Sequence, residues 1–332
     1  MKPSIKINDH GGILIDADVV IDGHEDFLPR VVTHIHSDHI RGLENTLNNK
    51  QKIVSTPLTA EWLKAYGYKI PENSLISLRY GEKVELEGYS LLLDKAEHIP
   101  GSAQVILENL ENGLRIVYPG DFKKVGKGTK VWESDILIID AVYGNPAYVR
   151  EFDDFIEMLL SDLVSELLAR GSVHIYGYYG KIQEVMQLLR IYGIDAPFIL
   201  SHKQFLLAKI AENHGMKFGE FFHVNSSEAQ EIIKSNWYVY FTHASSYSRL
   251  NANSNVSHVM LSGWEFTKPY RDLGNNRYLV AFSDHADFRG LVEYVSSSKP
   301  QMLVVNNVRS SSGSLFAEYI KTKLNIKSVI LP

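Results

Sequence analysis

Residues 33–39 read Thr-His-Ile-His-Ser-Asp-His, and they decide how the rest of the chain is interpreted. The stretch follows an apolar strand and leads into a predicted helix. At the extended end of a strand, residues two apart face the same way, so His34 and His36 converge. Where the chain turns into the helix, Asp38 and His39 swing to the other side. Four potential ligands in six positions predict a metal site, because imidazole and carboxylate groups suit zinc, manganese or iron.

Two further residues stand at the ends of predicted strands. His98 lies in Ala-Glu-His-Ile-Pro-Gly-Ser, a turn between two strands, and Asp121 lies in Tyr-Pro-Gly-Asp-Phe just past a strand. Taken alone, each is better explained as an ordinary turn residue than as a metal ligand. Their order after the first motif, and their placement at strand ends, predict that they are additional ligands.

Composition limits the classes of protein that this chain can represent. Its 332 residues are 45% hydrophobic and 22% charged, which is typical of a soluble globular protein with one large domain or two ordinary ones. The absence of cysteine excludes disulfides and thiolate–zinc sites. No apolar run approaches the ~20 residues of a membrane helix, and the polar stretch Met1–Gly12 does not resemble a signal peptide. We therefore expect a cytoplasmic protein with no membrane contact.

The net charge of −5 counts against a broad basic face that coats nucleic acid. It is compatible with an enzyme that grips a few phosphates.

The first 140 residues predict short strands and one clear helix, which Thr56 caps, Pro57 begins and Gly67 follows. Residues 111–113, Glu-Asn-Gly, suit a hairpin turn. The expected strands are Ile13–Ile21, Arg30–Thr33, Lys52–Ser55, Tyr89–Asp94, Ser102–Glu108 and Leu114–Tyr118.

After Asp140, strands and helices alternate, which favours a parallel sheet covered by helices. A Ser- and Asn-rich stretch, Ala244–Ser257, is expected to be a surface loop. We therefore predict one sandwich domain, residues 1–145 and 277–332, interrupted by an α/β module, residues 146–276. The elements expected in the module are Phe152–Ala169, Val173–Tyr176, Ile182–Tyr192, Phe198–Leu200, Gln204–His214, Glu220–Val224, Ser227–Lys234 and Tyr238–Thr242.

The full order of ligand-type residues resembles the metallo-β-lactamase superfamily. The resemblance implies an αββα sandwich and two divalent metal ions, zinc at the first position and zinc or manganese at the second. It further implies that an early aspartate, matched here by Asp16, braces the site. The first metal would be held by His34, His36 and His98 and the second by Asp38 and His39, with Asp121 bridging the two.

Two later segments resemble the first two motifs of the β-CASP nucleases, superfamily members with an inserted α/β cassette. In one, an apolar strand ends at Asp140; in the other, Ser-Asp-His-Ala-Asp places His285 between a strand and a helix. The resemblance implies that His285 acts on the leaving group and that Asp140 supports it. On its position alone, His285 is equally well explained as a structural histidine at the N-terminus of a helix, packed beside Asp287.

Local segments resemble the crosslink-repair DNA nucleases that include Artemis: residues 140–146, residues 262–264 and residues 98–101. Residues 101–104 resemble bacterial ligase-associated exonucleases. RNA-cutting relatives place a metal-binding histidine where this chain has Asn306, and an amide is a poor zinc ligand. The resemblance thus implies a DNA 5′–3′ exonuclease in repair with a weakly held second metal. An RNA-processing nuclease is the alternative.

Several residues are candidates for binding nucleic acid. Lys123 and Lys124 lie in a lysine-rich loop, although such runs are commonly solvated surface. Lys181 stands at a predicted helix N-terminus, where a phosphate could dock. Residues 309–314, which begin with Arg309 and Ser310, could cradle a terminal phosphate.

The aromatic side chains Tyr178, Tyr179 and Trp264 could stack on bases, or simply pack. Two other functions stay open at this point: a thioester or lactone hydrolase, and a non-catalytic scaffold subunit.

Overall fold

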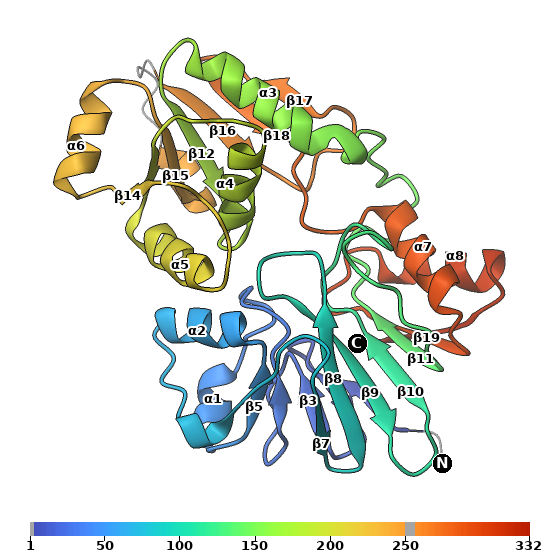
Figure 1. Cartoon of the computed structure of the whole chain (residues 1–332). Coiled ribbons are helices and arrows are strands. Elements are labelled where there is room, and N and C mark those ends of the chain that lie inside the picture. The colour runs from blue at the N-terminus through green and yellow to red at the C-terminus, as the bar shows by residue number, and fades with distance from the viewer. Residues whose placement is uncertain (1–2, 250–255) are drawn as a thin grey trace. The chain divides into compact units, whose positions relative to one another are not determined.

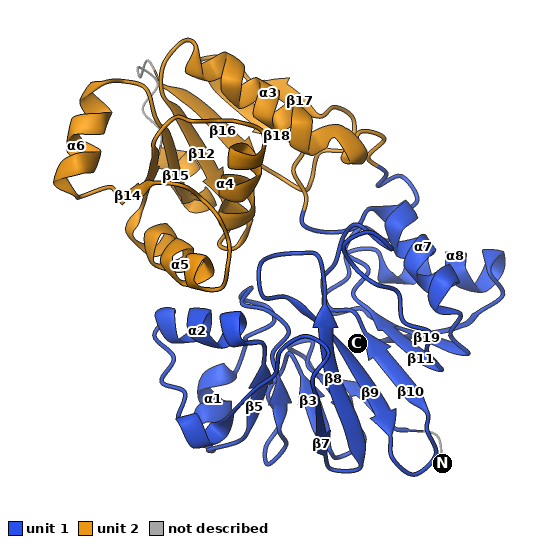
Figure 2. Cartoon of the chain, in the orientation of Figure 1, with its two compact units in different colours: residues 1–149, 284–332 blue, residues 150–283 orange. Residues whose placement is uncertain are grey.

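The computed structural model describes residues 3–249 and 256–332 of the chain. It contains two compact units: unit 1, residues 1–149 and 284–332, and unit 2, residues 150–283 (Figure 2). Unit 2 is thus inserted into unit 1, but its end differs from the predicted boundary at 276/277. The reason is strand β18 (Arg277–Val280), expected in the sandwich, which pairs instead with β16 (Ser257–Leu261) of unit 2.

The first sheet of unit 1 is built from the N-terminal third of the chain. The predicted single strand Ile13–Ile21 is wrong, because the chain reverses at Asp16, which has a left-handed φ of 51°. Strands β3, β4, β5 and β6 run parallel. In spatial order the strands are β1 (Ile5–Ile7), β2 (Ile13–Ile15), β3 (Val19–Ile21), β4 (Arg30–Val31), β5 (Ile53–Ser55) and β6 (Leu75–Ser77).

The second sheet of unit 1 joins the middle of the sequence to its end. Four antiparallel strands continue into three parallel ones, and the last two come from the segment after unit 2 (Figure 1). In spatial order they are β20 (Lys327–Leu331), β19 (Met302–Asn306), β11 (Ile136–Ile139), β10 (Arg115–Tyr118), β9 (Ala103–Asn109), β8 (Tyr89–Lys95) and β7 (Lys83–Leu86).

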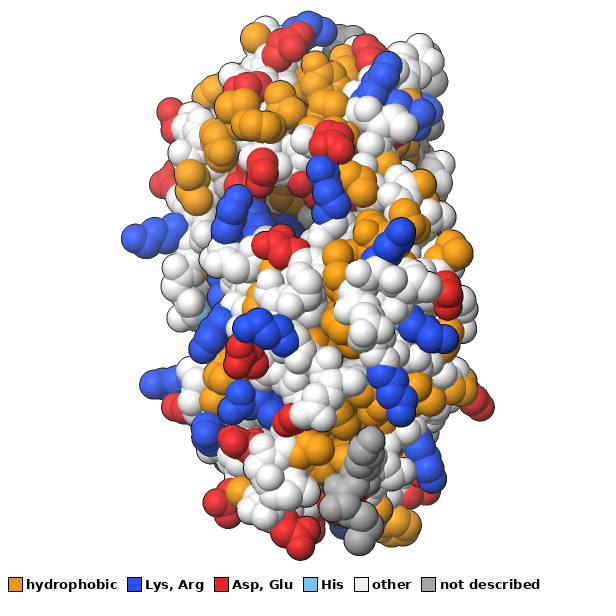
Figure 3. All heavy atoms as spheres, turned by 90° about the vertical axis from the view of Figure 1, so that its right-hand side faces the viewer, with side chains coloured by type: hydrophobic (Ala, Val, Ile, Leu, Met, Phe, Trp, Pro, Cys, Tyr) orange, Lys and Arg blue, Asp and Glu red, His pale blue; other side chains and the backbone are white. Residues whose placement is uncertain are grey.

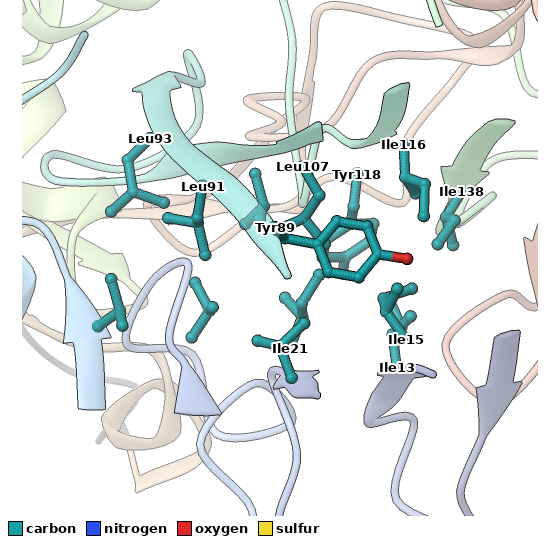
Figure 4. Packing of buried hydrophobic residues seen from close by; sticks show 14 of the residues in the cluster. Ile13, Ile15, Ile21, Tyr89, Leu91, Leu93, Leu107, Ile116, Tyr118 and Ile138 are labelled. Atoms are coloured by element: carbon teal, nitrogen blue, oxygen red, sulfur yellow. The ribbon is translucent and has the colours of Figure 1, made fainter. Parts of the chain in front are cut away.

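The two sheets of unit 1 face each other across an apolar core. Alternate residues of their strands, such as Ile13, Ile15, Leu91 and Leu93, point into it (Figure 4). Helices α1 (Leu43–Asn48) and α2 (Pro57–Ala65) lie beside the first sheet (Figure 1). Helices α7 (Phe288–Ser298) and α8 (Gly313–Lys323) pack on the other face of the second sheet. Unit 1 is therefore an αββα sandwich, as predicted.

The termini of helix α2 follow from its sequence. The Thr56 hydroxyl accepts a hydrogen bond from the Thr59 amide at 3.3 Å, and Pro57 occupies the first helical position. Gly67 follows with a φ of 103°, a conformation that favours glycine. The sequence prediction for this helix is confirmed.

Unit 2 is a seven-stranded sheet that is parallel except for one edge strand, β17. Of the predicted loop Ala244–Ser257, residues 250–255 lie outside the described residues. No helix in the described ranges is long and apolar enough to cross a membrane. The strands, in spatial order, are β14 (Phe221–His223), β13 (Phe198–Leu200), β15 (Val239–His243), β12 (Val173–Gly177), β16, β18 and β17 (Tyr270–Asp272).

The remaining helical elements complete the two units. Unit 2 contains α3 (Ile156–Leu168), α4 (Lys181–Ile191), α5 (His202–Asn213) and α6 (Ser227–Lys234). The short 3-10 turns are η1 (Glu72–Ser74) in unit 1 and η2 (Asp153–Phe155) and η3 (Ala244–Arg249) in unit 2.

Candidate metal centre

Three histidines and an aspartate meet at one edge of the sandwich. The imidazole centroids of His34 and His36 are 4.8 Å apart, and the His98 ring lies 4.6 Å from the first and 4.8 Å from the second. Asp121 Oδ2 is 3.4 Å from His34 Nε2 and 3.7 Å from His98 Nε2. Ligand atoms of all four residues lie within 4.8 Å of one another. The structure thus brings together the whole set that was predicted for the first metal.

Strand ends explain how these residues meet. The histidine loop leaves β4, His98 lies in the turn between β8 and β9, and Asp121 follows β10. His98 Nδ1 donates a hydrogen bond to the carbonyl oxygen of Asp284 at 2.8 Å. This bond fixes the ring and leaves Nε2 as the atom available to a metal.

A second group of ligands shares Asp121. His39 Nε2 lies 3.3 Å from Asp121 Oδ2 and 3.4 Å from Asp38 Oδ2, so the residues predicted for the second metal are also together. The structure adds Asp140, which offers an oxygen within 4.8 Å of the ligand atoms of His39 and Asp121.

Asp140, the predicted support of His285, contacts two other residues. Its Oδ2 accepts a hydrogen bond from the Tyr118 hydroxyl at 2.7 Å and forms an ion pair with Arg309 Nη1 at 3.6 Å. The carboxylate is therefore part of the second ligand group, and its support of His285 stays a prediction.

The aspartate that braces the centre is Asp22, and the prediction of Asp16 is wrong. The carboxylate of Asp22 accepts hydrogen bonds from the Thr33 amide at 2.8 Å and from His39 Nδ1 at 2.8 Å. The carboxylate of Asp16 instead accepts from the Ser4 amide and the Tyr89 hydroxyl. The cause is the parallel register of β3 and β4, which sets the end of β3 beside the start of the histidine loop.

Burial and charge hold the first ligands in the forms that metals bind. Burial lowers the pKa of His36 to about 3, and it also lowers those of His34 and His98, so all three imidazoles are neutral. Burial alone would raise the pKa of Asp121, but the nearby charges of His285 and His39 lower it well below its ordinary value. The first ligand group therefore presents three neutral imidazoles and an ionised carboxylate.

Three buried atoms show that the residues fit a divalent metal. His34 Nε2, His39 Nε2 and Asp140 Oδ1 have no hydrogen-bond partner among the described residues. An unsatisfied buried polar atom costs ~1–3 kcal/mol, so such atoms ordinarily have a ligand. All three belong to the groups that meet at Asp121, and nitrogen and oxygen donors of this kind bind zinc.

His285 lies at the rim of the centre, between β18 and α7. Its side chain is 25% exposed, and its Nδ1 is 3.7 Å from Asp121 Oδ1. Its ring centroid lies 4.9 Å from that of His98 and 5.9 Å from that of Tyr143. A small pocket beside it is also lined by Asp121 and Asp140. A half-buried histidine here can reach a group bound at the metals.

Two of the lysines proposed to bind substrate are buried. Lys181 begins α4, but its Nζ donates to the carbonyl oxygen of Phe282 at 3.1 Å. Lys123 is buried near Glu97; burial alone would raise the pKa of Glu97, but lysine charges, including that of Lys123, lower it. Both side chains thus lie inside the protein, and their contact with substrate stays a prediction. Lys124 is exposed and stays a candidate.

The residues after β19 are also used internally, so their predicted contact with substrate is wrong. Asn306 is fully buried, and its amide donates to the Gly11 carbonyl and accepts from the Val308 amide. The Ser310 hydroxyl donates to the Asn306 carbonyl and accepts from the Ala141 amide at 2.7 Å.

The Arg309 side chain is 3% exposed and faces Asp140. Its position is a feature that sequence reasoning missed.

Comparison with known proteins gives a consistent picture. A protein of Acidianus ambivalens, described as an uncharacterized protein in the lig 3′ region, is 44% identical over 42% of this chain and all of its own length. RNase aCSPSF2 of Saccharolobus solfataricus is 26% identical over 91% of this chain and 73% of its own. Other relatives are named as ribonucleases, a transcription termination factor and, matched over 28% of its length, a probable DNA ligase. No family model matches the chain.

A solved structure from Enterococcus faecalis, of a protein of unknown function, shares the fold. Its TM-score is 0.62 at 14% identity, over 93% of this chain and 81% of that one. The named ribonucleases are members of the β-CASP group, and they align with this chain over up to nine tenths of its length. The chain belongs to the β-CASP nucleases of the metallo-β-lactamase superfamily.

Proposed function

We propose that this chain hydrolyses phosphodiester bonds in DNA from a 5′ end, with two divalent metal ions. We assign zinc to the first position and zinc or manganese to the second. The observation that carries the proposal is the convergence of two ligand groups on Asp121, with His285 at their rim. When bound, two such ions lower the pKa of water toward neutrality and neutralise charge on a phosphoryl group.

The residues of the chain have distinct tasks in this reaction. His34, His36 and His98 hold the first position, and Asp121 is shared. His285 holds a proton close to the phosphate and delivers it to the departing oxygen, a role that suits histidine at neutral pH. The His98–Asp284 hydrogen bond links the turn before α7 to the first ligand group, so it also keeps His285 in place.

DNA is favoured over RNA by two observations. The relative from Acidianus is named for its position beside a lig gene, and another relative is a probable DNA ligase. RNA-cutting relatives carry a metal-binding histidine at the position of Asn306. The Asn306 side chain is buried, and both its amide nitrogen and its amide oxygen form hydrogen bonds within the protein. RNA is the second candidate substrate, because several relatives are named as ribonucleases.

Each unit by itself has exposed side chains that suit contact with an unpaired strand. Lys124 is exposed in the loop after Asp121. Tyr178 and Trp264, 53% and 57% exposed, follow the parallel strands β12 and β16, and ligands of such sheets bind at the carboxyl ends of strands. Exposed aromatic rings stack on bases of any sequence. On the face in Figure 3, Lys and Arg side chains are interspersed with Asp and Glu, so we expect a shallow dependence on salt.

The substrate is tested by digesting a 5′-phosphorylated single-stranded DNA and the matching RNA under the same salt and metal. Labels at either end report the direction of cutting. We expect faster loss of DNA that begins at the 5′ end. Faster cutting of RNA would transfer the assignment to the second candidate, and shortening from the 3′ end alone would overturn the direction.

The role of His285 is tested by His285→Ala. We expect this variant to fold and to bind metal like the wild type, but to lose ~10²-fold or more in turnover. His202→Ala, which removes an exposed histidine of unit 2, is the matched control and is expected to keep full activity. Normal turnover of His285→Ala, or loss of its metal, would remove His285 from proton transfer.

A further inference from the structure

Arg309 places a buried positive charge at the second ligand group. Its Nη2 donates to the carbonyl oxygens of Asp22 and of Asp38, the latter at 3.1 Å. Its Nη1 donates to the Tyr118 hydroxyl at 3.3 Å and lies 3.6 Å from Asp140 Oδ2. The guanidinium is thus tied to two loops and a strand of unit 1, and it cannot turn away toward solvent.

Asp140 connects this charge to the metal position. Its Oδ2 faces the Tyr118 hydroxyl and Arg309, whereas its Oδ1 is buried without a hydrogen-bond partner among the described residues. The carboxylate also belongs to the ligand group of His39 and Asp121. Arg309 therefore stands one carboxylate away from an ion at the second position.

The guanidinium keeps its charge in this environment. Burial alone would lower the pKa of Arg309, but the neighbouring Tyr118, Asp140 and Asp22 raise it above its ordinary value. A buried charge is poorly screened by solvent and salt, so it repels a nearby divalent cation more strongly than a surface arginine does. It also offsets part of the negative charge that Asp140 brings to the metal.

We propose that Arg309 is a resident cation of the second metal position and makes that position bind a divalent ion more weakly than the first. This inference rests on the two metal positions of the proposed function and assigns a cause to their difference. As free metal rises, the position of His34, His36 and His98 fills first. The position of His39 fills at a higher concentration, so the metal supply sets how much protein carries both ions.

The inference is tested by titrating metal-free protein with Zn²⁺ against a chelator of known affinity. For the wild type we expect two affinities that differ by ~10²-fold or more. Arg309→Gln removes the charge and keeps a polar side chain, and it should tighten the second affinity ~10-fold or more without changing the first. Arg309→Lys keeps the charge and should tighten the second affinity less than Arg309→Gln does.

Arg41→Gln is the matched control, because it removes one positive charge from an exposed position of the same unit. We expect both affinities to be unchanged in this variant.

Two equal affinities in the wild type would overturn the inference, and that measurement needs no variant to fold. An Arg309→Gln protein that keeps its first metal but binds the second no more tightly would also overturn it, since Arg309 would then only support the Asp38 loop. These outcomes are separate from failure of the proposed function. A protein that binds two metals unequally yet cuts no nucleic acid contradicts only the nuclease assignment, and an active nuclease with equal sites contradicts only the role of Arg309.

Discussion

Asp22 connects the second ligand group to the strand beside it. Its carboxylate accepts the Nδ1 proton of His39, which leaves Nε2 of that ring directed at Asp121 and Asp38. It also accepts the amide of Thr33 at the start of the ligand loop. Partners of this kind orient metal ligands, and their loss typically costs 10–100-fold in metal affinity.

Asp22→Asn is therefore expected to weaken Zn²⁺ binding by ~10–100-fold. Asp16→Asn is the matched control, because Asp16 is likewise an aspartate that follows a short apolar strand but contacts Ser4 and Tyr89. Its metal affinity should equal that of the wild type. Competition with a chelator measures both, and a larger effect at Asp16 would restore that residue to the bracing role.

The metal-free protein should lose stability in mild acid. His36 has its pKa lowered by burial to about 3, so below ~6.5 the unfolded chain binds protons that the folded chain does not. The contribution of neutral His36 to the free energy of unfolding is present above pH ~6.5 and is lost as the pH falls toward ~3. His34 and His98 act in the same direction.

His39 acts oppositely, because its raised pKa contributes stability that is lost only as pH rises. We expect a lower melting temperature at about pH 5 than at about pH 7 after chelation. An equal or higher value would contradict these shifts.

At the scale of elements, strand ends could be predicted and strand partners could not. The strands β5, β8, β9 and β10 lie within two residues of their predicted ranges, because apolar alternation and turn residues are local signals. Asp16 and Asp22 both follow three apolar residues and look alike in sequence. They differ only in that β3 pairs with β4, a contact that no local pattern encodes.

The role of Arg309 was beyond sequence reasoning for the same reason. Its polar turn suggested a surface cradle, but its guanidinium reaches carbonyls at Asp22 and Asp38, which are 287 and 271 positions away in the chain. The four buried ligands, His34, His39, His98 and Asp121, could be predicted because each lies in a segment that follows a strand, and the ends of these strands meet at one edge of the sandwich.

Helix α7 supports the position of His285 through its first turn. Asp287, two residues after His285, caps the helix: its carboxylate accepts a hydrogen bond from the Gly290 amide at 3.0 Å. Asp287→Ala should lower stability by ~1 kcal/mol and turnover by several-fold, because the cap and the turn move together. Ser226→Ala removes the corresponding cap of α6, a bond of 3.1 Å, and should cost similar stability with full activity. Equal turnover in the two variants would show that the α7 cap does not support the position of His285.

For the whole molecule, all predicted metal ligands belong to unit 1. Zinc should therefore raise the melting temperature of unit 1 and leave that of unit 2 unchanged, since a ligand stabilises only the unit that binds it. A concentration of ~100 times the dissociation constant adds ~2.7 kcal/mol. Calorimetry with and without chelator measures this, and His98→Asn should abolish the shift. A single transition that moves as a whole would contradict it.

The placement of unit 2 within unit 1 has a consequence for synthesis. The seven strands of unit 2 lie in one continuous stretch, residues 150–283, whereas β19 and β20 of unit 1 come after it. On the ribosome, unit 2 can therefore finish folding while the earlier-made sandwich still lacks β19, which pairs with β11, and β20, which pairs with β19. During that interval the apolar strand β11 is an open edge, and the nascent chain must avoid aggregation there until residues 284–332 emerge.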